Sequence, residues 1–280
     1  MQIILDDRTI YYETWGTGQR VNLFVHGFGD SLHTWDWVRD YFSDDFTNIA
    51  LDLSGCGRSS PPPDLAYAQV HQAKVIARFA EAVSLENFNI VCHSLGGSIT
   101  LHFLHYFREE AILKQVDKLV FINPVAYLSE FPAFLRILRK ERVAQSVLRF
   151  LPIQVVAAYV AYLLSPRIGS LPLFYQHFMG LLRQPNEKET ILESSRQILP
   201  ENVAELVRAY DQIDIPALIV WGEKDRLMPV SLGNRLQSDL PRAELALIPN
   251  SGHNPHQDNP AMVFDKIRPF LLSAISKSQS

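Results

Sequence analysis

The chain has 280 residues, 47% of them hydrophobic and 20% charged, which provides apolar material for a sizeable core and excludes a globally disordered chain. Its formal net charge of −4 gives no overall reason to expect nucleic-acid binding. The sequence contains no phosphate-binding glycine loop and no zinc-spaced set of Cys and His residues, so it predicts neither a nucleotide-binding protein nor a structural-metal protein.

Along the chain, short apolar runs alternate with stretches of helical spacing. The predicted strands cover residues 10–14, 21–25, 47–51, 88–92, 118–122, 217–221 and 245–248. The predicted helices cover residues 66–83, 97–109, 230–240 and 260–276, the last of them interrupted or kinked by Pro269. This alternation predicts an α/β fold with a mostly parallel central sheet, helices on both faces, and the first two strands paired as a hairpin at one edge.

The alternation breaks between residues 125 and 212. This stretch is helix-like, rich in Leu, Phe and Val, and shows no clear strand pattern. We expect a helical insertion over the carboxyl ends of the strands, where open α/β sheets bind their ligands. The predicted organisation is therefore a core domain of residues 1–124 and 213–280 and a helical insertion of residues 125–212.

The stretch around Ser94 is the strongest local motif. The apolar run 88–92 leads into a serine flanked by small residues, which is typical of a strand that turns sharply into a helix with the serine hydroxyl exposed. Such a turn suits a nucleophile, and the small flanking residues let strand and helix approach closely. Cys92 stands where this motif usually has glycine, so its side chain must be packed and the geometry of the turn is in question.

A serine hydroxyl is a poor nucleophile at neutral pH and needs a general base that a carboxylate orients. Asp225 follows the predicted strand 217–221, and His253 follows the predicted strand 245–248. Because both come after strand ends at the same edge of the sheet as Ser94, we expect the three side chains to meet. Two backbone N–H groups are candidates to bind a developing oxyanion, that of Leu95 at the helix start and that of Phe28 in the glycine-rich loop 26–30.

Five segments together resemble the α/β-hydrolase superfamily, and the resemblance covers nearly the whole chain. They are His26-Gly27-Phe28-Gly29, Asp52-Leu53-Ser54-Gly55-Cys56-Gly57-Arg58-Ser59, Cys92-His93-Ser94-Leu95-Gly96-Gly97, Gly222-Glu223-Lys224-Asp225 and Gly252-His253. The resemblance implies Ser94 as nucleophile, Asp225 as acid, His253 as base, and an oxyanion hole from Phe28 and Leu95. It also implies that the helical insertion is the family's cap, and that neither cofactor nor metal is required.

Other polar residues near these segments receive structural interpretations. The resemblance makes His26 a loop-fixing residue, and Asp52 and Arg58 are interpreted in the same way. We expect His93 to point away from Ser94, His256 to be a weaker rival base, and Asp258 to lie near the start of the last helix. Some family members carry the acid where this chain has Asn123, which favours Asp225. His102 and His105 share a helix face but lack a third metal ligand.

The insertion supplies the candidate substrate contacts. We expect an apolar small-molecule substrate to touch a set of apolar side chains there: Phe131, Phe134, Phe174, Phe178 and Met179. Residues 131–200 carry nine Lys and Arg against four Glu, with a basic cluster at 136–142. This cluster is interpreted as a solvated outer face, with peripheral membrane contact through the cap as the alternative. The sequence does not determine the oligomeric state.

Compartment is indicated by the N-terminus and the cysteines. The first eight residues lack the basic start and apolar core of a signal peptide, and the longest apolar-looking run, 150–164, falls short of the roughly 20 residues that a spanning helix needs. Cys56 and Cys92 do not suggest a disulfide framework, which fits a reducing compartment. We therefore expect a soluble, cytoplasmic protein.

Three functions fit these observations. The first is a carboxylesterase- or lipase-like serine hydrolase that cleaves a carboxylic ester of a hydrophobic small molecule through an acyl-enzyme. The second is a carbon–carbon bond hydrolase of the same fold, which the same three residues would serve. The third is a ligand-binding or signalling protein that keeps the site but turns over slowly. Fold relatives with a carboxylate nucleophile, the epoxide hydrolases and haloalkane dehalogenases, are disfavoured by serine at position 94.

Overall fold

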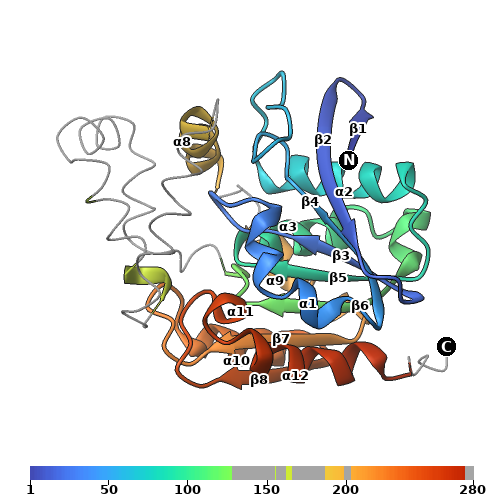
Figure 1. Cartoon of the computed structure of the whole chain (residues 1–280). Helices are drawn as coiled ribbons and strands as arrows, with labels where there is room; N and C mark the ends of the chain where they lie inside the picture. The colour runs from blue at the N-terminus through green and yellow to red at the C-terminus, as the bar shows by residue number, and fades with distance from the viewer. Residues whose placement is uncertain (128–154, 156–161, 166–186, 199–202, 275–280) are drawn as a thin grey trace.

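The computed structural model describes residues 1–127, 155, 162–165, 187–198 and 203–274 (Figure 1). An eight-stranded sheet forms its centre, with the strand order β1-β2-β4-β3-β5-β6-β7-β8. The strands are β1 (Gln2–Leu5), β2 (Arg8–Trp15), β3 (Arg20–Val25), β4 (Phe46–Leu51), β5 (Phe88–His93), β6 (Val116–Ile122), β7 (Ala217–Gly222) and β8 (Ala243–Ile248). From β4 to β8 every neighbouring pair is parallel, which confirms the predicted mostly parallel α/β sheet.

The predicted hairpin is wrong in its pairing. β2 pairs antiparallel with β1 and with β4, whereas β3 lies between β4 and β5 and runs parallel to both. The sharp turn is instead at Asp6, which has a φ of 54° and joins β1 to β2. The reason lies in burial: the last four residues of β3 are fully enclosed, as an interior strand requires, while the half-exposed β2 suits a place near the edge.

Helices cover both faces of the sheet. One face carries α2 (Gln69–Ala82), α3 (Leu95–Tyr106) and α10 (Val230–Asp239), whose apolar side chains join one buried cluster. The other face carries η1 (Leu32–Trp37), α1 (Arg39–Phe42) and α12 (Pro260–Leu272), which join a second. In Figure 1, α12 lies in red alongside β7 and β8. The remaining described helices are η2 (Ala111–Gln115), α8 (Glu187–Gln197), α9 (Val203–Arg208), η5 (Tyr210–Gln212) and α11 (Pro255–Asp258).

Successive residues of a buried strand belong to different clusters. In β5, Ile90 and Cys92 contribute to the cluster under α2 and α3, while Val91 contributes to the cluster under α12. This follows from the two-residue period of a strand, which sends neighbouring side chains to opposite faces. A parallel strand covered on both sides therefore has to be apolar throughout, as the run before Ser94 is.

The last helix is not interrupted at its proline. Pro269 lies inside α12, which continues to Leu272 instead of being interrupted. The proline lies in the last turn, on the exposed side of the helix. Its ring therefore faces solvent, and the backbone hydrogen bond that it cannot donate is lost at the helix end. The helix ends at Leu272, a few residues short of the predicted position 276.

Of the predicted insertion, the described part is chiefly α8, α9 and η5, and none of these described residues forms a strand. Helix α8 is attached to the loop that follows β4. The side-chain amide of Gln197 accepts from the backbone N–H groups of Tyr67 and Ala68 at 2.8 and 3.1 Å and donates to the Leu65 carbonyl at 2.7 Å. Thr190 Oγ1 donates to the Gly55 carbonyl at 2.9 Å. Helix α8 of the predicted insertion is thus hydrogen-bonded to the loop after β4.

A row of polar side chains crosses three neighbouring strands inside the molecule. Asn22 Nδ2 donates to Asn48 Oδ1 at 2.9 Å, and Asn89 Nδ2 donates to Asn22 Oδ1 at 2.9 Å. The three residues occupy paired positions on β4, β3 and β5. Asn48 also donates to the Phe42 carbonyl at 2.9 Å, which connects the row to the end of α1. The three amides are buried, and their hydrogen bonds connect β4, β3 and β5 at the same position along the strands.

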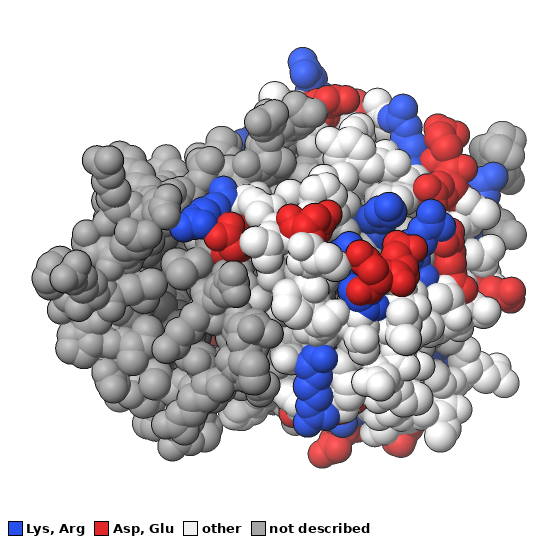
Figure 2. Space-filling model, turned by 90° about the horizontal axis from the view of Figure 1, so that it is seen from above, with Lys and Arg blue, Asp and Glu red and all other residues white. Residues whose placement is uncertain are grey.

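The described surface is mixed in charge. On the face that Figure 2 shows, Lys and Arg side chains are interspersed with Asp and Glu side chains over the described part of the core domain. Among the helices formed by described residues, none has both the length and the apolar character needed to cross a membrane.

Candidate active site

Ser94 lies at the junction between β5 and α3 in a strained backbone conformation. Its φ of 51° and ψ of −117° fall in a region that L-residues rarely adopt. Three backbone hydrogen bonds hold it there: its N–H donates to the Ile122 carbonyl at 3.0 Å, and its carbonyl accepts from Gly97 and Val125 at 3.0 and 2.9 Å. The predicted sharp strand-to-helix turn is therefore present, with Ser94 at its apex.

Close backbone approach explains the small residues after the serine. A Cβ atom added to Gly96 would lie 2.5 Å from the Val25 carbonyl oxygen, and one added to Gly97 would lie 2.5 Å from Pro124 Cβ. Neither distance allows a side chain. Glycine is thus required at both positions for α3 to pack against β3 and against the end of β6.

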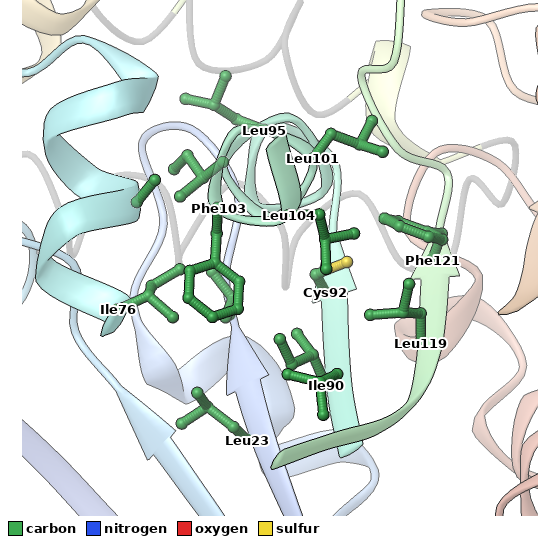
Figure 3. Close-up of a cluster of buried hydrophobic side chains, with 14 of the residues drawn as sticks. Leu23, Ile76, Ile90, Cys92, Leu95, Leu101, Phe103, Leu104, Leu119 and Phe121 are labelled. Atoms are coloured by element: carbon green, nitrogen blue, oxygen red, sulfur yellow. The ribbon is translucent and has the colours of Figure 1, made fainter. Parts of the chain in front are cut away.

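Position 92, two residues before Ser94, has room for a side chain, unlike positions 96 and 97. The Cys92 side chain is fully buried among apolar side chains between the sheet and α3, close to Ile90, Leu104 and Leu119 (Figure 3). Its Sγ donates to the Val120 carbonyl at 3.4 Å, and burial raises the pKa of the thiol to about 12, so it stays protonated. A side chain at this position fits the core, and the turn forms with cysteine in place of glycine.

Asp225 sits in the loop after β7, where its carboxylate accepts four hydrogen bonds. Oδ1 accepts from the backbone N–H groups of Leu227 and Met228 at 2.7 and 2.9 Å. Oδ2 accepts from Asn123 Nδ2 at 2.6 Å and from His253 Nδ1 at 2.8 Å. These donors fix the carboxylate in one orientation toward the imidazole.

His253 connects this carboxylate to the serine. Nδ1 donates to Asp225, and Nε2 lies 2.8 Å from Ser94 Oγ, where it can accept a hydrogen bond from the hydroxyl. The His253 side chain is 2% exposed and the Asp225 side chain is 0% exposed. The three residues that the sequence places after three different strands therefore form one buried chain of hydrogen bonds.

Two further histidines, His93 and His256, lie close to His253. His93 Nε2 donates to the His253 carbonyl at 3.0 Å, so this nitrogen is bonded to the main chain of the candidate base. The His256 ring lies 4.6 Å from the His93 ring and bonds through Nε2 to Thr34 Oγ1 at 3.1 Å. Burial, reinforced by neighbouring imidazoles, lowers the pKa of His93 to about 3 and that of His256 well below its ordinary value. Both rings are therefore neutral.

The glycine-rich loop after β3 lies against the serine. A Cβ atom added to Gly27 would lie 3.1 Å from Ser94 Cβ, so the loop backbone passes beside the nucleophile candidate. Phe28 and Leu95 line one common cavity. Leu95 is the first residue of α3, and its N–H is one of the helix-start donors that has no partner within the helix. The geometry brings both oxyanion-hole candidates to the same place.

The residues interpreted as loop-fixing have that role in the structure. His26 Nε2 accepts from the Leu53 N–H at 3.0 Å, and its Nδ1 donates to the Gly27 carbonyl at 2.9 Å. The Asp52 carboxylate accepts from the backbone N–H groups of Leu32 and Arg58 at 2.7 and 2.9 Å. These contacts join the loops after β3 and β4 beside the site.

Two site residues have partners that the sequence reasoning did not foresee. Asn123 has a φ of 42° and bridges the site, since it donates to Asp225 and accepts from the Gly222 N–H at 3.2 Å. Its place directly after a strand, in a residue type that tolerates positive φ, is the available signal. Asp258 lies in α11 and accepts from the Gly252 N–H at 2.7 Å and from Ser165 Oγ at 2.6 Å. It therefore anchors the loop that carries His253.

The predicted substrate contacts Phe131, Phe134, Phe174, Phe178 and Met179, like the basic cluster 136–142, lie outside the described residues and stay predictions. His102 Nδ1 donates to the Ser98 carbonyl at 2.7 Å, and His105 lies 3.9 Å from a Glu205 oxygen. Within the described parts of the chain, no group of three or more His, Cys, Asp or Glu side chains is arranged to hold a metal ion.

Comparisons with known proteins agree with this architecture. An uncharacterized protein of Mycobacterium tuberculosis is 28% identical over 91% of this chain and 76% of its own length. The uncharacterized hydrolase YugF of Bacillus subtilis is 24% identical over 95% of this chain and 96% of its own. A thermophilic esterase from Thermogutta terrifontis, 23% identical, superposes with a TM-score of 0.76 over 94% of this chain and 93% of its own. The family described as alpha/beta hydrolase fold matches residues 23–260, and the chain therefore belongs to the alpha/beta hydrolase family.

Proposed function

We propose that the protein is a serine hydrolase that cleaves a carboxylic ester of an apolar small molecule through an acyl-enzyme. One observation carries the proposal: Ser94 Oγ, His253 and Asp225 form a continuous buried chain with both connecting distances at 2.8 Å. In this arrangement a neutral imidazole accepts the serine proton while a fixed carboxylate holds its tautomer.

The proposed reaction begins when Ser94 Oγ attacks the ester carbonyl carbon and His253 Nε2 takes the hydroxyl proton. The tetrahedral oxyanion accepts hydrogen bonds from the Phe28 and Leu95 N–H groups, and Asp225 stabilises the imidazolium. The C–O bond to the alcohol then breaks, and His253 gives its proton to the leaving oxygen. In the second half, His253 takes a proton from water, the hydroxide attacks the acyl carbon, and Ser94 is released as the proton returns to Oγ.

Fixed groups around the base support this assignment. Asn123 and the Leu227 and Met228 N–H groups hold the Asp225 carboxylate, and His93 holds the main chain of His253. The relatives add support at a coarser level: YugF is named a hydrolase, and the Thermogutta terrifontis protein is named an esterase. Hydrolysis is the reaction class common to the geometry and to these names.

The test combines active-site labelling with turnover. Wild-type protein should react with a fluorophosphonate probe and hydrolyse 4-nitrophenyl esters, and Ser94→Ala should lose labelling and at least about a thousandfold of kcat, because the covalent step needs the hydroxyl. Ser98→Ala is the matched control, since Ser98 is buried one turn further along α3. A protein that is labelled at Ser94 but hydrolyses carbon–carbon bonds and no ester would contradict the ester assignment. Absence of both labelling and turnover over a broad ester panel would contradict the serine mechanism.

A further inference from the structure

Both backbone polar groups of His253 are hydrogen-bonded. Its carbonyl accepts from His93 Nε2 at 3.0 Å, and its N–H donates to the Leu164 carbonyl at 2.9 Å. The first partner is the sequence neighbour of Ser94, whereas the second lies in segment 162–165, which falls within the predicted insertion. The main chain of the candidate base is thus held between two parts of the chain that are distant in sequence.

Ser165 reaches the same loop through Asp258. The Ser165 hydroxyl donates to Asp258 Oδ1 at 2.6 Å, and Asp258 Oδ2 accepts from the Gly252 N–H at 2.7 Å. Ser165 is 1% exposed and Asp258 is 3% exposed, so these hydrogen bonds lie in the interior, where they are electrostatically stronger than in water. Gly252 directly precedes His253. The segment therefore holds two consecutive peptide N–H groups of this loop, the first through a carboxylate and the second directly.

The same segment contacts the loop of the candidate acid. Arg226, which follows Asp225, donates from Nη1 to the Tyr162 carbonyl at 2.8 Å and to the Ser165 carbonyl at 3.3 Å. Its guanidinium carbon lies 4.2 Å from the centroid of the Tyr162 ring, in a cation–π contact. Segment 162–165 thus connects the loops that follow β7 and β8, so its position is coupled to the positions of the carboxylate and the imidazole.

We infer that Ser165 is a positioning residue for the general base, and that it acts on His253 through Asp258 and the Gly252 peptide. The inference rests on the serine hydrolase mechanism proposed above and extends the residues that support the chemical step into the predicted insertion. Proton transfer from Ser94 Oγ to His253 Nε2 needs a short, aligned contact, and a displacement of about 1 Å can cost about a hundredfold in rate.

Steady-state kinetics with 4-nitrophenyl acetate test this role. Ser165→Ala removes the donor to Asp258, and kcat should fall by about tenfold while KM stays within about twofold, because the base is displaced and substrate binding is retained. Ser165→Thr keeps the hydroxyl and should recover most of the loss. In an Asp258→Ala background, Ser165→Ala should lower kcat by less than about twofold, since the connection to the loop is already broken.

Gln197→Met is the matched control. Gln197 also attaches the predicted insertion to the rest of the molecule, but its hydrogen bonds go to the loop after β4, which carries none of the three reacting residues. Its kcat should stay within about twofold of the wild type. Arg226→Met removes the donor to the Tyr162 and Ser165 carbonyls. It should lower kcat in the same way as Ser165→Ala, and it tests the contact of segment 162–165 if Ser165→Ala does not fold.

Hydrogen–deuterium exchange gives a readout that does not depend on turnover. The N–H groups of Gly252 and His253 are the ones that the segment holds. In Ser165→Ala both should exchange at least about fivefold faster than in the wild type, because the loop opens more readily once its attachment is weakened. Backbone N–H groups within α10 serve as the internal reference, and their exchange should be unchanged.

The outcomes separate this inference from the proposed function. Wild-type kcat in Ser165→Ala, or unchanged exchange of the Gly252 and His253 amides, overturns the positioning role while fluorophosphonate labelling of Ser94 leaves the serine hydrolase proposal standing. Equal losses of kcat in Ser165→Ala and Gln197→Met also overturn it, because they would show a general effect of attaching the insertion. A wild-type protein with neither labelling nor turnover overturns the proposed function, and the exchange rates then still decide whether Ser165 holds the loop of His253.

Discussion

At the scale of single residues, His93 makes a contact that no reacting group requires. Its Nε2–H donates to the main-chain carbonyl of His253 at 3.0 Å, and its side chain is buried. Asp225 accepts a hydrogen bond from the His253 ring, and His93 donates one to the main-chain carbonyl of the same residue. We expect His93 to position the base, although it sits next to the serine in sequence.

Replacing His93 tests this positioning role. His93→Phe removes the donor, leaves the His253 carbonyl without its partner, and should lower kcat by about ten- to a hundredfold while KM changes little, because small misplacements of a base affect the chemical step. His93→Gln keeps an N–H donor and should recover most of the loss. Steady-state kinetics on one ester check both variants. Equal kcat values for the phenylalanine and glutamine variants would contradict the role of the hydrogen bond.

Most reacting residues could be predicted from sequence because each follows a strand end. Ser94, Asp225 and His253 come after buried apolar runs, and parallel strands bring their carboxyl ends to one edge. Asn123 also follows a strand end, but the contacts of Asn123 and Asp258 could not be predicted from such a position. Their partners, Asp225 and Gly222 for the first and Gly252 and Ser165 for the second, depend on how loops fold onto one another. Side-chain hydrogen bonds between loops leave no periodic signal.

At the scale of secondary-structure elements, the asparagine row sets the register of three strands. Asn48, Asn22 and Asn89 occupy paired positions, and a shift of any one strand by a single residue would separate them and turn its side chains to the other face. An apolar strand between two apolar strands has little else to distinguish one register from the next. The row therefore adds specificity to the central strands, which position the Ser94 turn and the loop of Phe28.

A substitution in the middle of the row should be costly. Asn22→Leu removes one donor and one acceptor. It leaves Asn48 Oδ1 buried without its donor and Asn89 Nδ2 with only the Val21 carbonyl at 3.3 Å, so the free energy of unfolding should fall by about 2 kcal/mol. Urea unfolding followed by circular dichroism measures it. Asn234→Leu on the exposed side of α10 is the control and should change stability by less than about 0.5 kcal/mol. Similar values for the two variants would show that the row contributes no stability.

Pairing of the first strands shows where sequence patterns do not determine topology. The runs 10–14 and 21–25 are neighbours in sequence and both are strands, yet β4 lies between them in the sheet. Hydrophobic periodicity predicts that a segment is extended, but the partner of a strand is chosen by burial on both faces and by the connections available. The short β1, with Ile4 exposed, carried too little apolar pattern to be predicted as the true hairpin partner.

At the scale of the whole molecule, two buried histidines couple folding to pH. Burial first, and then the neighbouring imidazole, lowers the pKa of His93 to about 3 and that of His256 well below 6.5. In the unfolded chain both have ordinary values near 6.5. Below that pH the unfolded state binds more protons than the folded state, so stability that is present above pH 6.5 is lost as the pH falls.

Urea unfolding between pH 7.5 and 4.5 checks this dependence. Below about pH 6 the free energy of unfolding should fall with a slope that approaches about 1.4 kcal/mol per pH unit for each of the two histidines. His256→Gln removes one titrating group and should make the slope shallower by about half. His71→Gln is the control, because His71 is exposed on α2, and its slope should match the wild type. A wild-type stability that is constant from pH 6 to 4.5 would contradict the neutral, buried state of both rings.

Cys92 has a consequence for recognising enzymes of this kind in other genomes. A search pattern that demands glycine two places before the nucleophile would discard this chain, although its serine turn is intact. The positions that admit no side chain are Gly96 and Gly97, where added atoms would collide at 2.5 Å. At position 92 the cysteine side chain lies buried in the layer under α3 without disturbing the turn. A search pattern that requires Gly96 and Gly97 but allows other residues two places before the serine would retain distant members. A pattern that also requires glycine at that earlier position would omit them.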